Sequence, residues 1–87
     1  MIDDIRWLEV VKIEAVGFDA IGPYEICVNF THGDGTWVPI YVHTPGYKQL
    51  VRNLHQRYPS IPPDWYDRMM ANPDWHVEQT LYERDGD

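Results

Sequence analysis

Residues 24–58 read YEICVNFTHGDGTWVPIYVHTPGYKQLVRNLHQRY, and the spacing of their apolar residues changes at Pro45. Before Pro45, apolar residues alternate with polar ones, which is the period of a β-strand. After it, they recur at three- and four-residue spacing, the period of an amphipathic helix. The alternating residues are Tyr24, Ile26, Val28, Phe30, Val38, Ile40 and Val42, and the helical ones are Tyr47, Leu50, Val51, Leu54 and Tyr58. The change predicts a sheet with a helix packed against it.

The alternating runs predict strands over residues 24–31 and 36–43. Asp34-Gly35 lies in the turn between them, and glycine accepts the positive φ that a tight hairpin needs. Pro39 cannot donate a hydrogen bond to a neighbouring strand, so the second strand is predicted to lie at a sheet edge. Residues 5–16 predict an earlier strand. Its imperfect alternation indicates either burial on both faces or a bulge near Val10 and Val11.

Residues 17–23 contain two glycines and a proline and predict a connection. Thr44 is the expected N-cap of the main helix, and Pro45 its first residue. This helix is expected to end near Tyr58, because the residue before a proline avoids the helical region.

A shorter helix is predicted from Pro63 to Ala71, with Trp65 and Met69 on one face, and a last strand from Trp75 to Glu83. The sequence therefore predicts a single α+β domain over residues 1–87 in the order β-β-β-α-α-β. Its parts are an antiparallel three-stranded meander, a main amphipathic helix, a short second helix and a returning C-terminal strand. The apolar stripe of the main helix requires one sheet face as its partner.

The 87 residues include fourteen acidic and seven basic side chains, a formal net charge of −7. This charge argues against a nucleic acid or an anionic membrane as main partner and favours a basic protein. A single cysteine, Cys27, allows no intramolecular disulfide and fits a reducing cytoplasm. The start Met1-Ile2-Asp3-Asp4 is acidic, and no apolar run approaches the roughly 20 residues that span a bilayer. We therefore expect a cytoplasmic protein without a secretory signal or membrane span.

Reactive groups are few and poorly spaced for chemistry. The four histidines are His32, His43, His55 and His76, and no pair has metal-ligand spacing, so we expect surface histidines, no metal and no cofactor. Cys27 and His43 lie on adjacent predicted strands and could form a nucleophile and base, but a small half-buried cysteine is the favoured interpretation. We therefore expect no catalytic residues and no enzyme activity.

One surface is predicted to bind a partner. Trp37, Tyr41 and His43 share the strand face opposite Val38, Ile40 and Val42. If the latter three are core, an aromatic group stands outward, as at many interaction sites. Two alternatives stay open. The second helix and last strand, with Trp65, Trp75 and Tyr82, could cover this face as a second core, or inverted parity could place Trp37 and Tyr41 in the main core.

Several short motifs occur in the chain from Pro23 onward. They are Asp34-Gly35, Pro45-Gly46-Tyr47 with Leu50, Tyr58-Pro59-Ser60-Ile61-Pro62, Asp64-Trp65-Tyr66 and Leu81-Tyr82-Glu83-Arg84. In these motifs the chain resembles a loose group of small, acidic, uncharacterised bacterial proteins. The motifs are structural and carry no catalytic signature. In size and charge alone, the chain is also similar to immunity proteins, which neutralise a toxin by binding it.

These observations favour a non-catalytic protein-binding or inhibitor module, immunity-like, with a basic protein as partner. We expect a monomer or a homodimer. The alternative is a small-ligand or regulatory domain that forms a homodimer through an edge strand. The third hypothesis is an enzyme that uses Cys27 with His43.

Overall fold

The computed structural model describes residues 1–19, 21–71 and 76–84. Its elements follow in the order η1 (Ile2–Asp4), η2 (Trp7–Glu9), β1 (Val10–Asp19), β2 (Tyr24–His32), β3 (Trp37–Ile40), α1 (Tyr47–Arg57), α2 (Trp65–Ala71) and β4 (His76–Glu83), where η denotes a 3₁₀ turn. The strands form one antiparallel sheet in the order β3-β2-β1-β4. The predicted α+β fold, with its three-stranded meander and returning strand, is confirmed.

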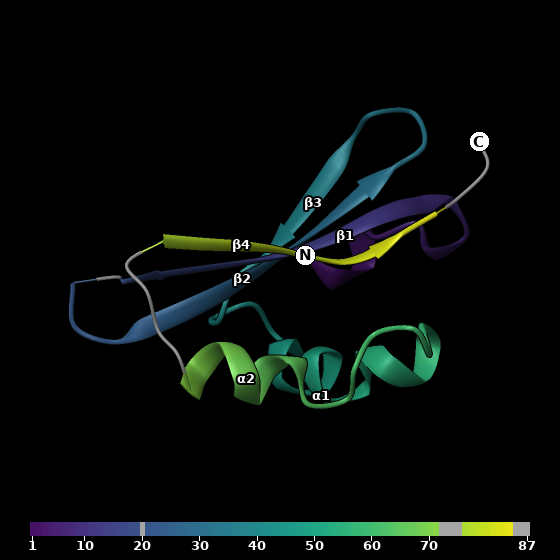
Figure 1. Cartoon of the computed structure of the whole chain (residues 1–87). Helices are drawn as coiled ribbons and strands as arrows, with labels where there is room; N and C mark the ends of the chain where they lie inside the picture. The colour runs from purple at the N-terminus through teal and green to yellow at the C-terminus, as the bar shows by residue number, and fades with distance from the viewer. Residues whose placement is uncertain (20, 72–75, 85–87) are drawn as a thin grey trace.

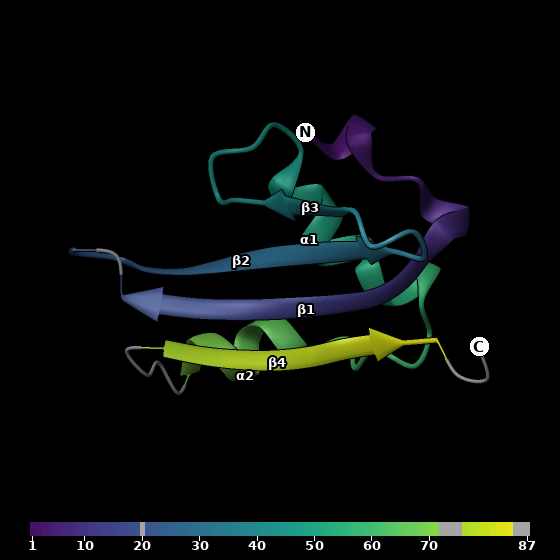
Figure 2. The same ribbon diagram turned by 90° about the horizontal axis from the view of Figure 1, so that it is seen from above.

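Both α-helices lie against the same face of the sheet (Figure 1). Figure 2 looks onto the opposite face, where neither of the two described α-helices covers the strands. The core fills the space between sheet and helices, and its fully buried large side chains are Trp65, Phe30, Ile13, Ile26, Ile40, Leu54, Ile61, Val10 and Val28. Burial of this kind contributes about 25 cal/mol per Å² of apolar surface, so this single layer holds the fold together.

The N-terminal segment differs from the prediction. Residues 5–9 are not part of a strand, because η1 and η2 precede β1, which begins only at Val10. Val10 faces His32 and Lys12 faces Thr31, so Val11 is an extra residue in the ladder. The predicted bulge is therefore confirmed, whereas the strand boundary was wrong. Turns allow Ile5 to become buried in the core without entering the sheet.

Strand β1 also continues further than predicted, into the expected connection. Gly17 faces Ile26 within the ladder. A Cβ atom at Gly17 would lie 2.1 Å from the hydroxyl oxygen of Tyr24, which is too close for any side chain. The glycine therefore makes room for a tyrosine ring within a strand, which is one established use of glycine in sheets.

Strand β3 is the predicted edge strand, and Pro39 lies in it opposite Asn29. It ends at Ile40, earlier than expected, because a turn follows. The Tyr41 N–H donates to the Thr44 hydroxyl (3.1 Å), and the Thr44 N–H donates to the Tyr41 carbonyl (2.9 Å). Val42, predicted to be core, is consequently 42% exposed.

Helix α1 has Gly46 as its N-cap, with φ of 88°, so the expected cap at Thr44 and start at Pro45 were wrong. The Thr44 hydroxyl is already engaged in the preceding turn. The helix ends at Arg57, close to the predicted end before Pro59. Tyr47 and Leu54 are buried, and the Tyr47 hydroxyl donates to the carbonyl of Ile26, which fixes α1 against β2.

Helix α2 buries Trp65 and Met69 as predicted, although it begins at Trp65 and not at Pro63. Strand β4 runs beside β1. Its predicted first residue, Trp75, lies outside the described residues. Ile13 faces Tyr82 and Glu14 faces Thr80, which leaves Leu81 as an extra residue. Over the described ranges, no helix has the length and apolar character needed to cross a membrane.

Candidate functional site

The predicted binding residues lie on the solvent side of the sheet edge. Trp37 is 59% exposed and Tyr41 is 42% exposed, while Val38 and Ile40 point into the core. The prediction that Trp37 and Tyr41 face outward is therefore confirmed. The inverted parity is wrong, and Trp65 belongs to the main core beneath the sheet, not to a second core over Trp37.

His43 is brought next to Tyr41 by the turn that follows β3. The two rings stack with centroids 6.0 Å apart and planes 7° apart. Both residues follow the strand and do not lie on it, because β3 ends at Ile40. Trp37 lies at the other end of the strand. The three residues therefore line the outer margin of the sheet and do not form a single compact cluster.

Strand register shows what adjoins these residues on the uncovered face, because directly opposite residues point to the same side of a sheet. Trp37 faces Thr31, which faces Lys12 on β1. Cys27 faces Val16, and Val16 faces Glu78 on β4. The apolar residues of this face are Val16, Phe18, Cys27, Trp37 and Pro39. Trp37 is thus the most exposed apolar residue of a mixed surface that crosses all four strands.

The charged residues of the uncovered face are mainly acidic. They are Glu14, Glu25, Glu78 and Glu83, together with one lysine, Lys12. The Lys12 ammonium lies 3.7 Å from the Glu14 carboxylate, and His76 Nε2 lies 3.3 Å from the Glu78 carboxylate. The surface therefore carries negative charge next to exposed aromatic rings.

Cys27 lies in the middle of this face, yet it is only 6% exposed. Its thiol lies 3.7 Å from the side-chain oxygen of Asn29, and burial raises the pKa of the thiol. The ladder between β2 and β3 ends at the pair Val28–Ile40, so His43 is not placed opposite Cys27 as a strand neighbour. A thiol held in its protonated form is a poor nucleophile.

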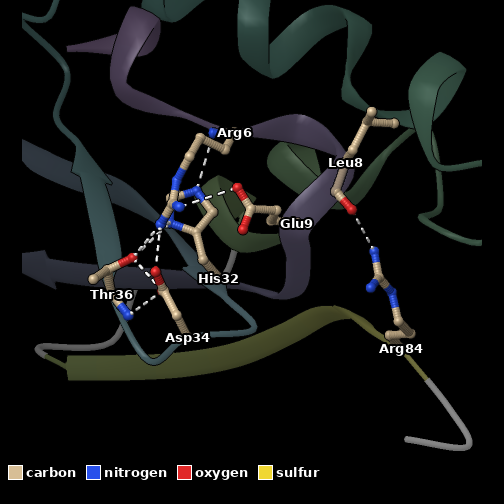
Figure 3. A network of polar contacts seen from close by, with 7 residues as sticks. All are labelled: Arg6, Leu8, Glu9, His32, Asp34, Thr36 and Arg84. Carbon is tan, nitrogen blue, oxygen red and sulfur yellow. Dashed lines mark hydrogen bonds and ion pairs between the residues drawn. The ribbon is translucent and has the colours of Figure 1, made fainter.

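A polar network that the sequence did not reveal joins the N-terminal turns to the hairpin between β2 and β3 (Figure 3). The backbone N–H of Arg6 donates to His32 Nε2 (3.0 Å), and His32 Nδ1 lies 3.0 Å from the Thr36 hydroxyl. The Thr36 hydroxyl donates to Asp34 Oδ1 (2.6 Å), and the Arg6 guanidinium donates to Asp34 Oδ2 (2.9 Å). The network closes a loop between segments that are 26 or more residues apart.

This network is structural in character. His32 is 2% exposed, so the prediction of a surface histidine was wrong at this position. Because Nε2 accepts from a backbone N–H, the proton of the ring is on Nδ1 and is directed to Thr36. Both ring nitrogens are therefore engaged, and neither is available to a substrate. The sequence signal that could have indicated it is Asp34-x-Thr36, because aspartate often accepts from the backbone N–H two residues later, as it does here.

Because of this network, the free energy of unfolding depends on pH. Hydrogen bonds from Thr36 and Arg6 hold the pKa of the Asp34 carboxyl well below its ordinary value of 3.8. The folded protein thus keeps Asp34 ionised at pH values where the unfolded chain takes up a proton, so this contribution is present above about pH 4 and is lost as pH falls. Asp34→Asn is expected to lose less stability than the wild type between about pH 5 and pH 2. Urea unfolding at a series of pH values measures the difference, and parallel curves would contradict it.

A shallow groove between the N-terminal turns and α1 is lined by Trp7, Leu50, Leu54 and Arg57. The Arg57 guanidinium lies 4.1 Å from the centre of the Trp7 ring. Arg57 is the one cation that lines this groove among the described residues, and the groove is shallow. This groove therefore gives less support to the small-ligand alternative than the uncovered face gives to protein binding.

A scan against protein-family models, a search of curated proteins and a search of solved structures found no match for this chain. The resemblance to small acidic bacterial proteins therefore stays a prediction.

Proposed function

We propose that this protein is a non-catalytic binding module, of the inhibitor type, that docks a basic protein on the uncovered sheet face. The observation that carries the proposal is the exposure of Trp37 (59%) and Tyr41 (42%) beside a sheet face that no described helix covers. Tryptophan and tyrosine are enriched among the residues that dominate binding energies. Exposed apolar surface with a polar rim is typical of protein-interaction sites.

The chemistry of the partner follows from the charges. The chain carries a net charge of −7, and the uncovered face has four glutamates against one lysine. A basic partner would be attracted over distances of about 10 Å at 0.1 M salt, and the attraction weakens as salt rises. The half-buried Val16 and Phe18 offer apolar contact area behind the aromatic margin.

The non-catalytic part of the proposal is supported by the state of the groups best suited to chemistry. The Cys27 thiol is buried with a raised pKa. Both nitrogens of His32 are engaged by Arg6 and Thr36. A module of this kind acts by covering a surface of its partner, and not by converting a substrate.

The first test is affinity capture from a lysate of the native host at low salt. Wild-type protein is expected to retain a basic protein that salt releases, and the double variant Trp37→Ala/Tyr41→Ala is expected to lose it. Leu8→Ala is the matched control, because Leu8 is 93% exposed and belongs to η2 and not to the sheet. With the purified partner, the double variant should weaken affinity by about 30-fold or more, the loss typical of a hot spot.

Two results would overturn the proposal. Equal capture by the wild type and the double variant would remove the aromatic residues from the site. Capture that does not change with salt would remove the electrostatic argument for a basic partner.

A further inference from the structure

The two edges of the sheet are protected differently. Strand β3 has only four residues, contains Pro39 and is contacted by η1 on its outer side (Figure 2). Strand β4 has eight residues and contains neither proline nor lysine. Within the described parts of the chain, nothing pairs with the outer side of β4. Of the features that shield edge strands, β4 has the bulge at Leu81 and the charges of Glu78 and Glu83, but it has no proline and no described segment covers it, so its outer side is still open to another strand.

The outward hydrogen-bonding groups of β4 can be assigned from its pairing with β1. The Arg84 N–H donates to the Val11 carbonyl (2.8 Å), next to the facing pair Lys12–Glu83. In an antiparallel ladder, such a bond flanks a pair whose own backbone groups point away from each other. Counting back along β4 through the extra residue Leu81 places the outward backbone groups at Thr80 and Glu78. An added strand would bond to these two residues.

We propose that two copies of this chain pair antiparallel through β4, with Gln79 on the twofold axis. In this register, Glu78 of one copy faces Thr80 of the other, and the outward backbone groups of both residues meet as hydrogen-bonded pairs. Val77 of one copy faces Leu81 of the other. Both of these residues pack on the core side of the sheet and flank the two Gln79 side chains, which face the same side because Gln79 pairs with Ala15.

Other registers are less favourable. Moving the axis to Glu78 keeps the hydrogen-bonding phase but sets two Glu78 carboxylates directly opposite each other, which is destabilising in a sheet. If the axis lay between two neighbouring residues, a residue whose backbone groups bond to β1 would face one whose backbone groups point outward. Side chains from opposite faces of the sheet would then be paired. The sequence around Gln79 is apolar at residues 77 and 81 and polar at 78–80, a pattern that is the same in both directions.

This dimer is independent of the proposed docking surface. In the order β3-β2-β1-β4, Trp37 lies at the opposite edge, so both copies keep it exposed. Each copy carries a net charge of −7, and salt screens the repulsion between copies. Dimerisation should therefore strengthen as salt rises, whereas binding of a basic partner should weaken. A contact confined to residues 77–81 is small and predicts a dissociation constant on the order of 0.1–1 mM.

The test is sedimentation equilibrium of the full chain from about 10 µM to 2 mM, at about 50 and 500 mM salt. Wild-type protein is expected to show a monomer–dimer equilibrium that shifts toward dimer at high salt. Thr80→Pro removes an outward N–H, and Gln79→Glu places two carboxylates at the axis. Each should lower the association constant at least about 10-fold. Glu78→Gln should raise the constant, and Trp37→Ala should leave it unchanged.

A monomer at about 2 mM in high salt would overturn the proposal. A dimer that Thr80→Pro and Gln79→Glu leave intact would also overturn it, because another surface would then form the contact. If Thr80→Pro does not fold by circular dichroism, Gln79→Glu decides, since it keeps the backbone unchanged. Failure of partner capture with an intact dimer would count against the proposed function alone.

Discussion

Replacing Leu54 with alanine is expected to lower the free energy of unfolding by about 2–5 kcal/mol. Leu54 is 1% exposed and belongs to the core cluster that joins α1 to the sheet. Truncation removes buried methyl groups and leaves a cavity that a close-packed interior fills only in part. Small domains have a total stability of about 5–15 kcal/mol, so a loss of this size leaves little reserve.

Urea unfolding followed by far-ultraviolet circular dichroism measures this change. Leu8→Ala is the matched control, because the same substitution at a position that is 93% exposed should stay within about 0.5 kcal/mol of the wild type. A loss below about 1 kcal/mol at Leu54 would show that α1 does not pack through this stripe. If Leu54→Ala does not fold, Leu54→Met, which nearly keeps the volume, should cost less than about 1.5 kcal/mol.

Leu54 also illustrates what the sequence could predict. Strands β2 and β3 and helix α1 each have one buried face, so their apolar residues repeat with the period of the element. Pro39 carried a second signal, because its missing N–H limits it to an edge. These features are local, and the structure follows them closely.

The N-terminal turns and the start of α1 depend on interactions that local patterns do not contain. Arg6 is held by His32, which lies 26 positions further along the chain, so a strand pattern there was misleading. Thr44 matched the preference for an N-cap, but its hydroxyl bonds to Tyr41 instead. Gly46 then supplies the left-handed conformation before the helix.

The candidate site was predictable in part. The parity of β3 correctly placed Trp37 outside, because Val38 and Ile40 had to be inside. The sequence could not show that both helices pack on the same face and leave the other one uncovered. That arrangement depends on how the chain connects the helices to the sheet. Because the other face is left uncovered, the exposed aromatic side chains adjoin a continuous sheet surface.

Replacing Trp65 with alanine is expected to lower the free energy of unfolding by about 3–5 kcal/mol. Trp65 is 2% exposed, and its ring packs edge-to-face on Tyr66 with centroids 5.7 Å apart. Helix α2 has only seven residues. Isolated helices shorter than about 12–15 residues are marginal in water, so α2 depends on burying Trp65 and Met69 beneath the sheet.

Trp37→Ala is the matched control for this substitution, because it removes the same side chain from a position that is 59% exposed. The control should stay within about 0.5 kcal/mol of wild-type stability. For Trp65→Ala, the unfolding transitions followed by far-ultraviolet circular dichroism and by near-ultraviolet signals should coincide, because α2 shares one core with α1 and the sheet. Two separate transitions, or a loss below about 1 kcal/mol, would contradict this and would make α2 an appendage that the core does not require.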